Sequence, residues 1–332
     1  MEDTKKIRSR NTQSVREALR STGGATKQEV AHICGLSQAT CNTILNEMEQ
    51  RGEAVADKIA SAQVGRRASR YTLNSDYLHI LCLYVRRSRE KRELWYGILN
   101  FEGEVLEEAA RELDCLNEEL LVKTALDCIA RDPKITCISA GIAGGVQEGS
   151  IRYCDVEELA GVPLKEILEK ATGLVVCVEK DMRLIAYGFT QKGYTKEYAS
   201  LSVILMEEGV CPGTATVLDG KIVRGATGLA GEAGFVPCGI SWEEQAKLWK
   251  KETFFPFARQ TAAALIVYLN PECVVVSGNL TDEMLPERLT EACQETIPKE
   301  DMPKILWIPQ FHEFYVAGLF AEARTELEQK EL

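Results

Sequence analysis

Residues 26–52 read TKQEVAHICGLSQATCNTILNEMEQRG and contain the start and stop signals of two short helices. Thr26 and Glu29 match a capping box, in which the threonine side chain accepts from the amide of Glu29 and the glutamate reaches back. Gly35 stands where a helix commonly ends in a left-handed residue. Ser37 is of a type that caps the start of the next helix. The stretch is therefore predicted to fold as two helices joined by a tight turn.

A further helix is expected before this pair. It begins at the capping residue Asn11 and places Val15 and Leu19 on one face. Two helices joined by a short turn with glycine, the second of them capped, follow the plan of a helix-turn-helix. The same shape also occurs in plain helical packing, and that alternative stays open at this point. The last of the three helices has apolar residues at a spacing of three to four, which are Cys41, Ile44, Leu45 and Met48.

A β-hairpin is predicted after the three helices. Residues 53–60 (EAVADKIA) and 69–74 (SRYTLN) have the pattern of strands, and Arg66 and Arg67 lie near the tip between them. Arginine side chains on such a tip can clamp phosphates or enter a minor groove. Residues 1–75 carry a net charge of +4, which leaves −15 for the remainder of the chain. A basic segment on an acidic protein indicates a polyanionic partner for that segment alone.

Short polar side chains gather at the start of the third helix. In this position of a helix-turn-helix, side chains face base edges and phosphates. We therefore predict that residues 1–75 form a winged helix-turn-helix domain that binds double-stranded DNA. The residues expected to contact the DNA are Thr26, Ser37, Gln38, Ala39, Thr40, Asn42, Thr43, Arg66 and Arg67.

Residues 76–332 repeat one pattern twice, a group of strands followed by alternating helix and strand. This order predicts a two-lobed α/β domain with a ligand cleft between the lobes, the lobes being roughly 76–190 plus the C-terminal helix, and 191–310. Strands are expected at 77–85, 93–101, 104–112, 135–145, 174–181, 271–279 and 304–310, and a hairpin at 200–223. Helices are expected at 116–132, 162–173, 181–193, 251–270 and 311–327, with a glycine loop ending the strand at 135–145.

The composition, 45% hydrophobic and 27% charged, is that of an ordinary globular protein. No run of about 18 apolar residues occurs, so a membrane span is not expected. The twelve cysteines are scattered without a C-x-x-C pair, which favours buried thiols in a reducing cytoplasm over a zinc cluster. We expect a cytoplasmic protein without a metal or other cofactor.

The chain resembles the ROK family (repressors, open reading frames, kinases), and in particular its regulator branch, which carries an N-terminal winged helix. The most specific matching stretch is VLDGKIVRGATGLAGEAG at 217–234, joined by GIAGGV at 141–146 and PECVVVSGN at 271–279. The resemblance covers nearly the whole chain. It implies an actin- and hexokinase-like fold whose two lobes close on a sugar and ATP, and it implies homodimers or homotetramers.

All three nucleotide elements of the family depart from its pattern here. The phosphate loop between the first two strands corresponds to LYVRRSREKREL (83–94), which has no glycine. The second, glycine-rich in the family, reads MEEGVCPG (206–213) and carries Glu207 and Glu208. Each carboxylate about 4 Å from a phosphate charge costs about 4 kcal/mol at an effective dielectric constant near 20. The adenosine element, a glycine run in the family, reads Ser-Gly-Asn at 277–279.

The sugar site is partly retained. Asp181 matches the family's catalytic base, whereas the preceding asparagine of the motif is Lys180 and the histidine that contacts sugar and zinc is Phe235. Lys180 beside two carboxylates favours an altered, acidic ligand. Asp181 and Glu232 could equally be helix caps or salt-bridge partners. Effector contact is expected from Glu179, Lys180, Asp181 and Glu232.

The sequence therefore predicts a ROK-type transcriptional regulator, a repressor, whose kinase-like domain is catalytically inactive and serves pairing and effector binding. The partners expected are double-stranded DNA and a sugar or sugar derivative, and no membrane. The rival hypothesis is an active sugar kinase with a DNA-binding head. A third is a body that binds no small molecule and serves assembly alone.

Overall fold

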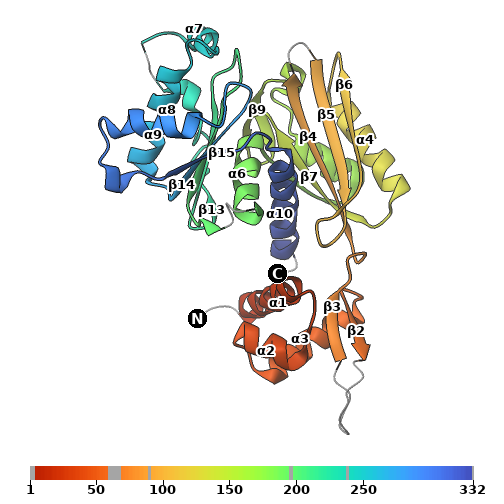
Figure 1. Ribbon diagram of the computed structural model, residues 1–332. Helices are drawn as coiled ribbons and strands as arrows, with labels where there is room; N and C mark the ends of the chain where they lie inside the picture. The colour runs from red at the N-terminus through yellow and green to blue at the C-terminus, as the bar shows by residue number, and fades with distance from the viewer. Residues whose placement is uncertain (1–3, 59–68, 89–90, 194–196, 237–238, 331–332) are drawn as a thin grey trace.

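The computed structural model describes residues 4–58, 69–88, 91–193, 197–236 and 239–330. The first part of the chain forms a three-helix unit with a small sheet, which lies below the rest in Figure 1. Its sheet has the order β1-β3-β2. Its elements are α1 (Thr4–Thr22), β1 (Ala25–Thr26), α2 (Lys27–Cys34), α3 (Gln38–Gln50), β2 (Ala54–Lys58) and β3 (Ser69–Leu73). This unit is a winged helix-turn-helix, with β2 and β3 as the wing.

The predicted end signals of α2 and α3 are confirmed. The side chain of Thr26 accepts from the amide of Glu29 at 3.3 Å, and Glu29 Oε2 accepts from the amide of Thr26 at 2.8 Å. Gly35 has a φ of 63°, the left-handed conformation that ends α2. Ser37 Oγ accepts from the amide of Thr40 at 3.1 Å. The residues that α3 buries are those predicted, Cys41, Ile44, Leu45 and Met48.

The prediction that the first helix begins at Asn11 is wrong, because α1 begins at Thr4. Residues 4–10 contain neither glycine nor proline, so nothing in them stops a helix. The added turns are held to α3 by the ion pair of Arg8 Nη2 with Glu47 Oε1 at 2.6 Å. Val15 and Leu19 are buried as expected.

The first lobe contains a five-stranded sheet of order β10-β7-β4-β5-β6. Strands β4, β5 and β6 are antiparallel, whereas β7 and β10 are parallel to β4. Two helices pack their apolar faces on one side of the sheet in a shared core. The elements are β4 (His79–Ser88), β5 (Lys91–Leu99), β6 (Val105–Leu113), α4 (Glu118–Arg131), β7 (Ile135–Ile142), α5 (Leu164–Thr172) and β10 (Val175–Lys180).

The second lobe repeats this sheet in the order β13-β12-β11-β14-β15. Strands β11, β12 and β13 are antiparallel, and β14 and β15 run parallel to β11. Helices α8 and α9 cover its outer face. The elements are β11 (Leu201–Leu205), β12 (Gly213–Leu218), β13 (Lys221–Ile222), α8 (Phe255–Leu269), β14 (Cys273–Ser277), α9 (Leu285–Gln294) and β15 (Lys304–Trp307).

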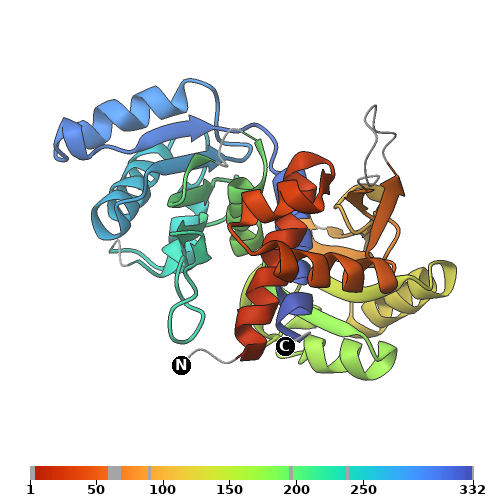
Figure 2. The same cartoon turned by 90° about the horizontal axis from the view of Figure 1, so that it is seen from below.

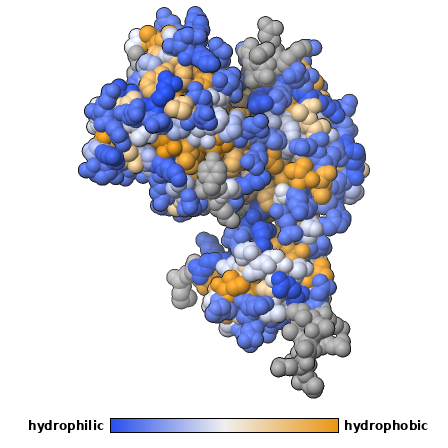
Figure 3. All heavy atoms as spheres, in the orientation of Figure 1, coloured by the Kyte–Doolittle hydropathy of each residue, from blue (hydrophilic) through white to orange (hydrophobic). Residues whose placement is uncertain are grey.

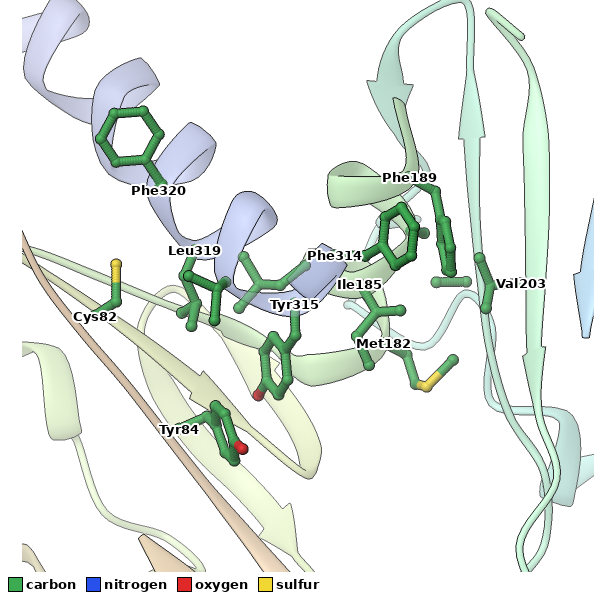
Figure 4. Packing of buried hydrophobic residues seen from close by; sticks show 14 of the residues in the cluster. Cys82, Tyr84, Met182, Ile185, Phe189, Val203, Phe314, Tyr315, Leu319 and Phe320 are labelled. Atoms are coloured by element: carbon green, nitrogen blue, oxygen red, sulfur yellow. The ribbon is translucent and has the colours of Figure 1, made fainter. Parts of the chain in front are cut away.

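Helices α6 (Asp181–Gln191) and α10 (His312–Lys330) lie between the two sheets. Their backbones touch at two glycines: a Cβ on Gly188 would lie 1.7 Å from the Phe314 carbonyl oxygen, and one on Gly318 would lie 1.8 Å from that of Leu184. Figure 4 shows Phe189 against Phe314, with ring centroids 4.1 Å apart, and Tyr84 against Tyr315 at 4.6 Å. The two helices thus share one core with both lobes.

Several elements differ from the prediction. The expected glycine loop after residue 142 is a hairpin of β8 (Gly144–Gln147) and β9 (Ser150–Cys154), because Gly144 lets the strands approach: a Cβ there would lie 2.2 Å from the Tyr153 carbonyl oxygen. The long helix expected at 251–270 begins only at Phe255, with proline in its first turn. Helices α7 (Trp242–Leu248) and α9 were not predicted. Across the described ranges, no helix is long and apolar enough to cross a membrane.

Candidate functional site

The exposed face of α3 carries part of the predicted DNA-binding set. Gln38, Ala39, Asn42 and Thr43 are exposed on neighbouring turns near the start of the helix. They project from a helix whose opposite face is fixed in the core by its buried residues. A rigid helix with exposed short polar side chains at its N-terminal end has the geometry for reading base edges in a major groove. Figure 2 shows the three helices of this unit from the side away from the lobes.

Three of the predicted contacts have a structural role. Thr26 and Ser37 are the caps of α2 and α3. The hydroxyl of Thr40 lies 2.8 Å from that of Ser37, and its backbone amide is bonded by Ser37. These groups hold the start of the two helices. Arg66 and Arg67 lie outside the described residues.

A cavity of about 330 Å³ opens between the two lobes. Lys180 and Asp181 reach it from the junction of β10 and α6, and Glu232 reaches it from the loop after β13. Tyr153 and Asp155, which the sequence analysis did not select, enter it from the β8–β9 hairpin and the residue after it. The sequence offered no direct signal for these two, because the hairpin itself was taken for a glycine loop.

Lys180 is paired within the protein. Its Nζ lies 2.6 Å from Glu232 Oε1, and its side chain is only 4% exposed. The acidic side chains on the described part of the cavity wall include the carboxylates of Asp155 and Glu207. The cavity therefore has an excess of negative charge. The expectation of an acidic ligand, based on Lys180, is not supported, because Glu232 already neutralises that cation.

Asp181 is the first residue of α6 and its carboxylate bonds its neighbour's amide, Oδ1 accepting from Met182 N at 2.6 Å. Burial raises the pKa of Asp181 to about 7; the positive charge of Lys180 acts in the opposite direction, and the carboxylates of Asp155 and Glu232 add to the rise. A carboxyl group that titrates near neutral pH suits a general base.

Glu179 lies in an ion-pair network away from the cavity. Its Oε1 accepts from Arg183 Nη1 at 2.9 Å and its Oε2 accepts from Arg224 Nε at 2.6 Å. Arg224 also donates to Glu322 Oε1 on α10 at 2.8 Å. The network ties β10, α6, α10 and the loop after β13 together. Glu179 was predicted to contact an effector; the structure places it outside the residues that line the cavity, with two arginine partners.

The loop 206–212, which aligns with a phosphate loop, is bonded to other parts of the protein. Asn279 Oδ1 accepts from the amide of Glu208 at 2.9 Å, and the Trp249 carbonyl accepts from the amide of Gly209 at 2.8 Å. Gly278 packs on the same loop so closely that a Cβ would lie 2.2 Å from the Met206 carbonyl oxygen. Backbone amides hold phosphate only when they point freely at it. Here two of those amides are bonded within the protein, one of them by the segment expected to hold adenosine.

The remaining phosphate element, residues 83–94, consists of two paired strands outside residues 89–90. The ladder of β4 and β5 continues to the pair Ser88–Lys91. Arg86 Nη2 donates to Glu93 Oε2 at 2.9 Å. Burial acts to lower the pKa of Arg86, but its hydrogen bond with Glu93 and the charges of Glu93 and Glu207 outweigh burial and raise it. Glu207 is half-buried, whereas Glu208 is exposed.

The chain matches known proteins in both of its parts. Residues 96–246 match the model of the ROK family, and residues 12–52 match the model of a winged helix-turn-helix DNA-binding domain. The chain is 23% identical over 299 residues to the xylose repressor of Caldicellulosiruptor bescii, across 81% of this chain and 69% of that protein.

Two solved structures share the fold. A ROK family transcriptional regulator, a homologue of the E. coli Mlc protein, superposes with a TM-score of 0.74 at 18% identity over 98% of both chains. A ROK hexokinase from Thermus thermophilus gives a TM-score of 0.61 at 20% identity, and all of that enzyme corresponds to 76% of this chain. The likeness to the regulator thus extends over nearly the whole chain, and the likeness to the hexokinase covers about three quarters of it.

Proposed function

Because the chain belongs to the ROK family, in the branch whose members carry an N-terminal winged helix, we propose that it is a DNA-binding transcriptional repressor without kinase activity. In this proposal α3 of each of two chains enters a major groove, and the wings lie beside the DNA backbone. The exposed face of Gln38, Ala39, Asn42 and Thr43 supports the choice of α3 as the reading helix. We place the protein in the cytoplasm, and we keep the domain boundary at residue 75 that the sequence suggests.

The observation that carries the absence of kinase activity is the bonded loop 206–212. An enzyme that bound a triphosphate there would have to break the Asn279–Glu208 and Trp249–Gly209 contacts. It would also have to place phosphate oxygens beside Glu207, at about 4 kcal/mol for each close pair of like charges. The retained base Asp181 favours the alternative of an active kinase. A base without a bound phosphoryl donor transfers no phosphoryl group. The bonded loop 206–212, where the donor would bind, therefore decides this proposal against kinase activity.

We further propose that ligand binding is transmitted to the winged helix through α6 and α10. Asp181 at the cavity is the first residue of α6, and α6 is locked to α10 at Gly188 and Gly318. The far end of α10 contacts α1, where Arg324 Nη2 lies 2.5 Å from Glu17 Oε1. Figure 1 shows α10 running from between the lobes to α1. A shift of α6 at the cavity is thereby carried to the DNA-binding unit as a movement of packed helices.

The cavity should accept a sugar that is uncharged or carries an amine, and should reject sugar phosphates. Among the described residues that line the cavity, the carboxylates of Asp155, Glu207 and Glu232 outnumber the one cation, Lys180. We expect a neutral hexose, pentose or hexosamine to raise the thermal midpoint, since a ligand at 100 times its Kd adds about 2.7 kcal/mol of stability. The Asp181→Asn variant should lose the shift. A larger shift with the 6-phosphate than with the parent sugar would contradict this ligand class.

The DNA-binding proposal is tested by selecting sequences from a random duplex pool with the full-length protein. The expected result is enrichment of a pseudo-palindrome whose half-sites are one or more helical turns apart, with an affinity that falls as salt is raised. Recovery of no sequence preference, together with binding no stronger than that of an unrelated acidic protein, would refute the proposal.

A further inference from the structure

The exposed side of α3 near its start presents two kinds of side chain in two stripes. Gln38 and Asn42 are four residues apart and so lie one above the other on the helix surface. Ala39 and Thr43 form the neighbouring stripe in the same way, and all four side chains are exposed. In Figure 3 the surface of the winged-helix unit on the side away from the lobes is mostly hydrophilic. We call these four side chains the reading face.

The first stripe of the reading face consists of two carboxamides. Among the described residues, neither Gln38 nor Asn42 has a side-chain hydrogen bond to another group of the protein. A carboxamide offers an N–H donor and a carbonyl acceptor side by side. In the major groove, adenine is the base that presents the matching pair, the N7 acceptor and the N6 amino donor. Both side chains therefore carry the groups for a bidentate contact with adenine.

The second stripe presents methyl groups. Thr43 Oγ1 donates to the Ala39 carbonyl oxygen at 3.1 Å, so this hydroxyl is used within the helix. The methyl group of Thr43 and the side chain of Ala39 remain for contact with a partner. In the major groove such methyl groups pack against the C5-methyl of thymine, the base that pairs with adenine. The two stripes thus suit the two bases of A·T pairs.

The groups that select G·C pairs are missing from the start of α3. Residues 38–46 read QATCNTILN and include no charged residue. Arginine and lysine are the side chains that bind guanine at O6 and N7, and aspartate and glutamate accept from cytosine N4. Two cations near α3 have partners within the winged-helix unit, since Arg8 pairs with Glu47 at 2.6 Å and Lys27 Nζ donates to Asn46 Oδ1 at 2.6 Å.

We propose that the base pairs under the reading face of α3 are A·T pairs. The carboxamides of Gln38 and Asn42 bind adenine at N6 and N7, and Ala39 and Thr43 contact the methyl group of thymine. This inference rests on the proposed function, in which α3 enters the major groove of an operator, and it names the bases that α3 reads there. An operator half-site should accordingly contain A·T pairs at the positions where the binding depends on these side chains.

Base analogues in an operator, selected from the random duplex pool with the full-length protein, test the inference. 7-Deazaadenine lacks the N7 acceptor of adenine but keeps its Watson–Crick pairing. In each half-site, its substitution at one or more A·T pairs should lower the affinity of the wild type about 5-fold or more, as measured by fluorescence anisotropy. Either Gln38→Ala or Asn42→Ala should bind the natural and the substituted base equally at that position, because the carboxamide that uses N7 is gone.

The methyl contact has its own matched pair of changes. Uracil in place of thymine removes the C5-methyl from the DNA, and Thr43→Ser removes the methyl from the protein while keeping the hydroxyl that bonds Ala39. Each change should lower the affinity about 2- to 4-fold, and the two together should cost no more than one. Gln50→Ala, at the other end of α3, is the control and should respond to both analogues as the wild type does.

The outcomes separate this inference from the proposed function. A preferred operator in which the positions sensitive to Gln38→Ala and Asn42→Ala are G·C pairs would overturn the inference and leave DNA binding intact. Equal loss from 7-deazaadenine in the wild type and in both alanine variants would also overturn it, because another part of the protein would then read the adenines. A wild type without any sequence preference would refute the proposed function and this inference with it.

Discussion

Replacing Gln38 and Asn42 together by alanine is expected to abolish operator recognition while leaving the protein folded. Both side chains are exposed on α3, and each well-placed contact to a base edge is worth about 1–3 kcal/mol. The pair should therefore lower the affinity for the selected operator roughly 30-fold or more, with little change on random DNA. Titration of labelled duplexes by fluorescence anisotropy, with operator and scrambled DNA side by side, measures the difference.

Two control variants separate base reading from phosphate contact. Gln50→Ala, at an exposed residue at the other end of α3, should bind the operator as the wild type does. Changing Arg66 and Arg67 to alanine should weaken binding to every sequence and reduce the salt slope by about 2, since two phosphate contacts are lost. Equal loss on operator and random DNA for the Gln38 and Asn42 variant would place the reading surface elsewhere.

Glu179→Ala is expected to destabilise the protein by about 3–5 kcal/mol, because it removes one partner of a buried ion pair. The guanidinium of Arg183 is only 2% exposed and would lose its carboxylate at 2.9 Å. Arg224 would lose its contact at 2.6 Å in the same variant. Urea unfolding followed by tryptophan fluorescence measures the loss.

Glu207→Ala is the matched control for this prediction. Glu207 is a half-buried glutamate on the wall of the ligand cavity, whereas Glu179 lies outside it. Its removal should cost about 1 kcal/mol or less, as for most partly exposed substitutions. If Glu179→Ala were as stable as the wild type and instead lost affinity for the sugar, Glu179 would be a ligand contact after all.

Local signals in the sequence were sufficient to predict the winged-helix unit. The capping box at Thr26, the left-handed Gly35 and the cap at Ser37 each act over three or four residues, so their geometry is almost independent of the rest of the fold. The repeated strand patterns of the two lobes were also clear. The start of α1 was missed because its first turns are fixed by Arg8 and Glu47, which are far apart in the sequence.

The ligand site was harder to predict, because the roles of its residues depend on partners distant in the chain. Whether Lys180 is available to a ligand depends on Glu232, and the role of Glu179 depends on Arg224. Tyr153 and Asp155 could be placed on the cavity wall only if the β8–β9 hairpin was predicted. The glycines there allow two strands to pack closely, whereas the sequence pattern suggested a loop. The hydrogen bonds that occupy amides of loop 206–212 likewise come from residues distant in the chain, Asn279 and Trp249.

Calorimetric titration of the full chain with Mg-ATP, in the presence of a sugar that raises its thermal midpoint, tests the central claim most directly. The claim is that loop 206–212, whose amides at Glu208 and Gly209 are already bonded by Asn279 and Trp249, does not hold a triphosphate, so that the protein works by holding DNA. The predicted result is no saturable heat, which corresponds to a Kd weaker than about 1 mM. Saturable binding in the micromolar range, with sugar phosphate formed, would contradict it.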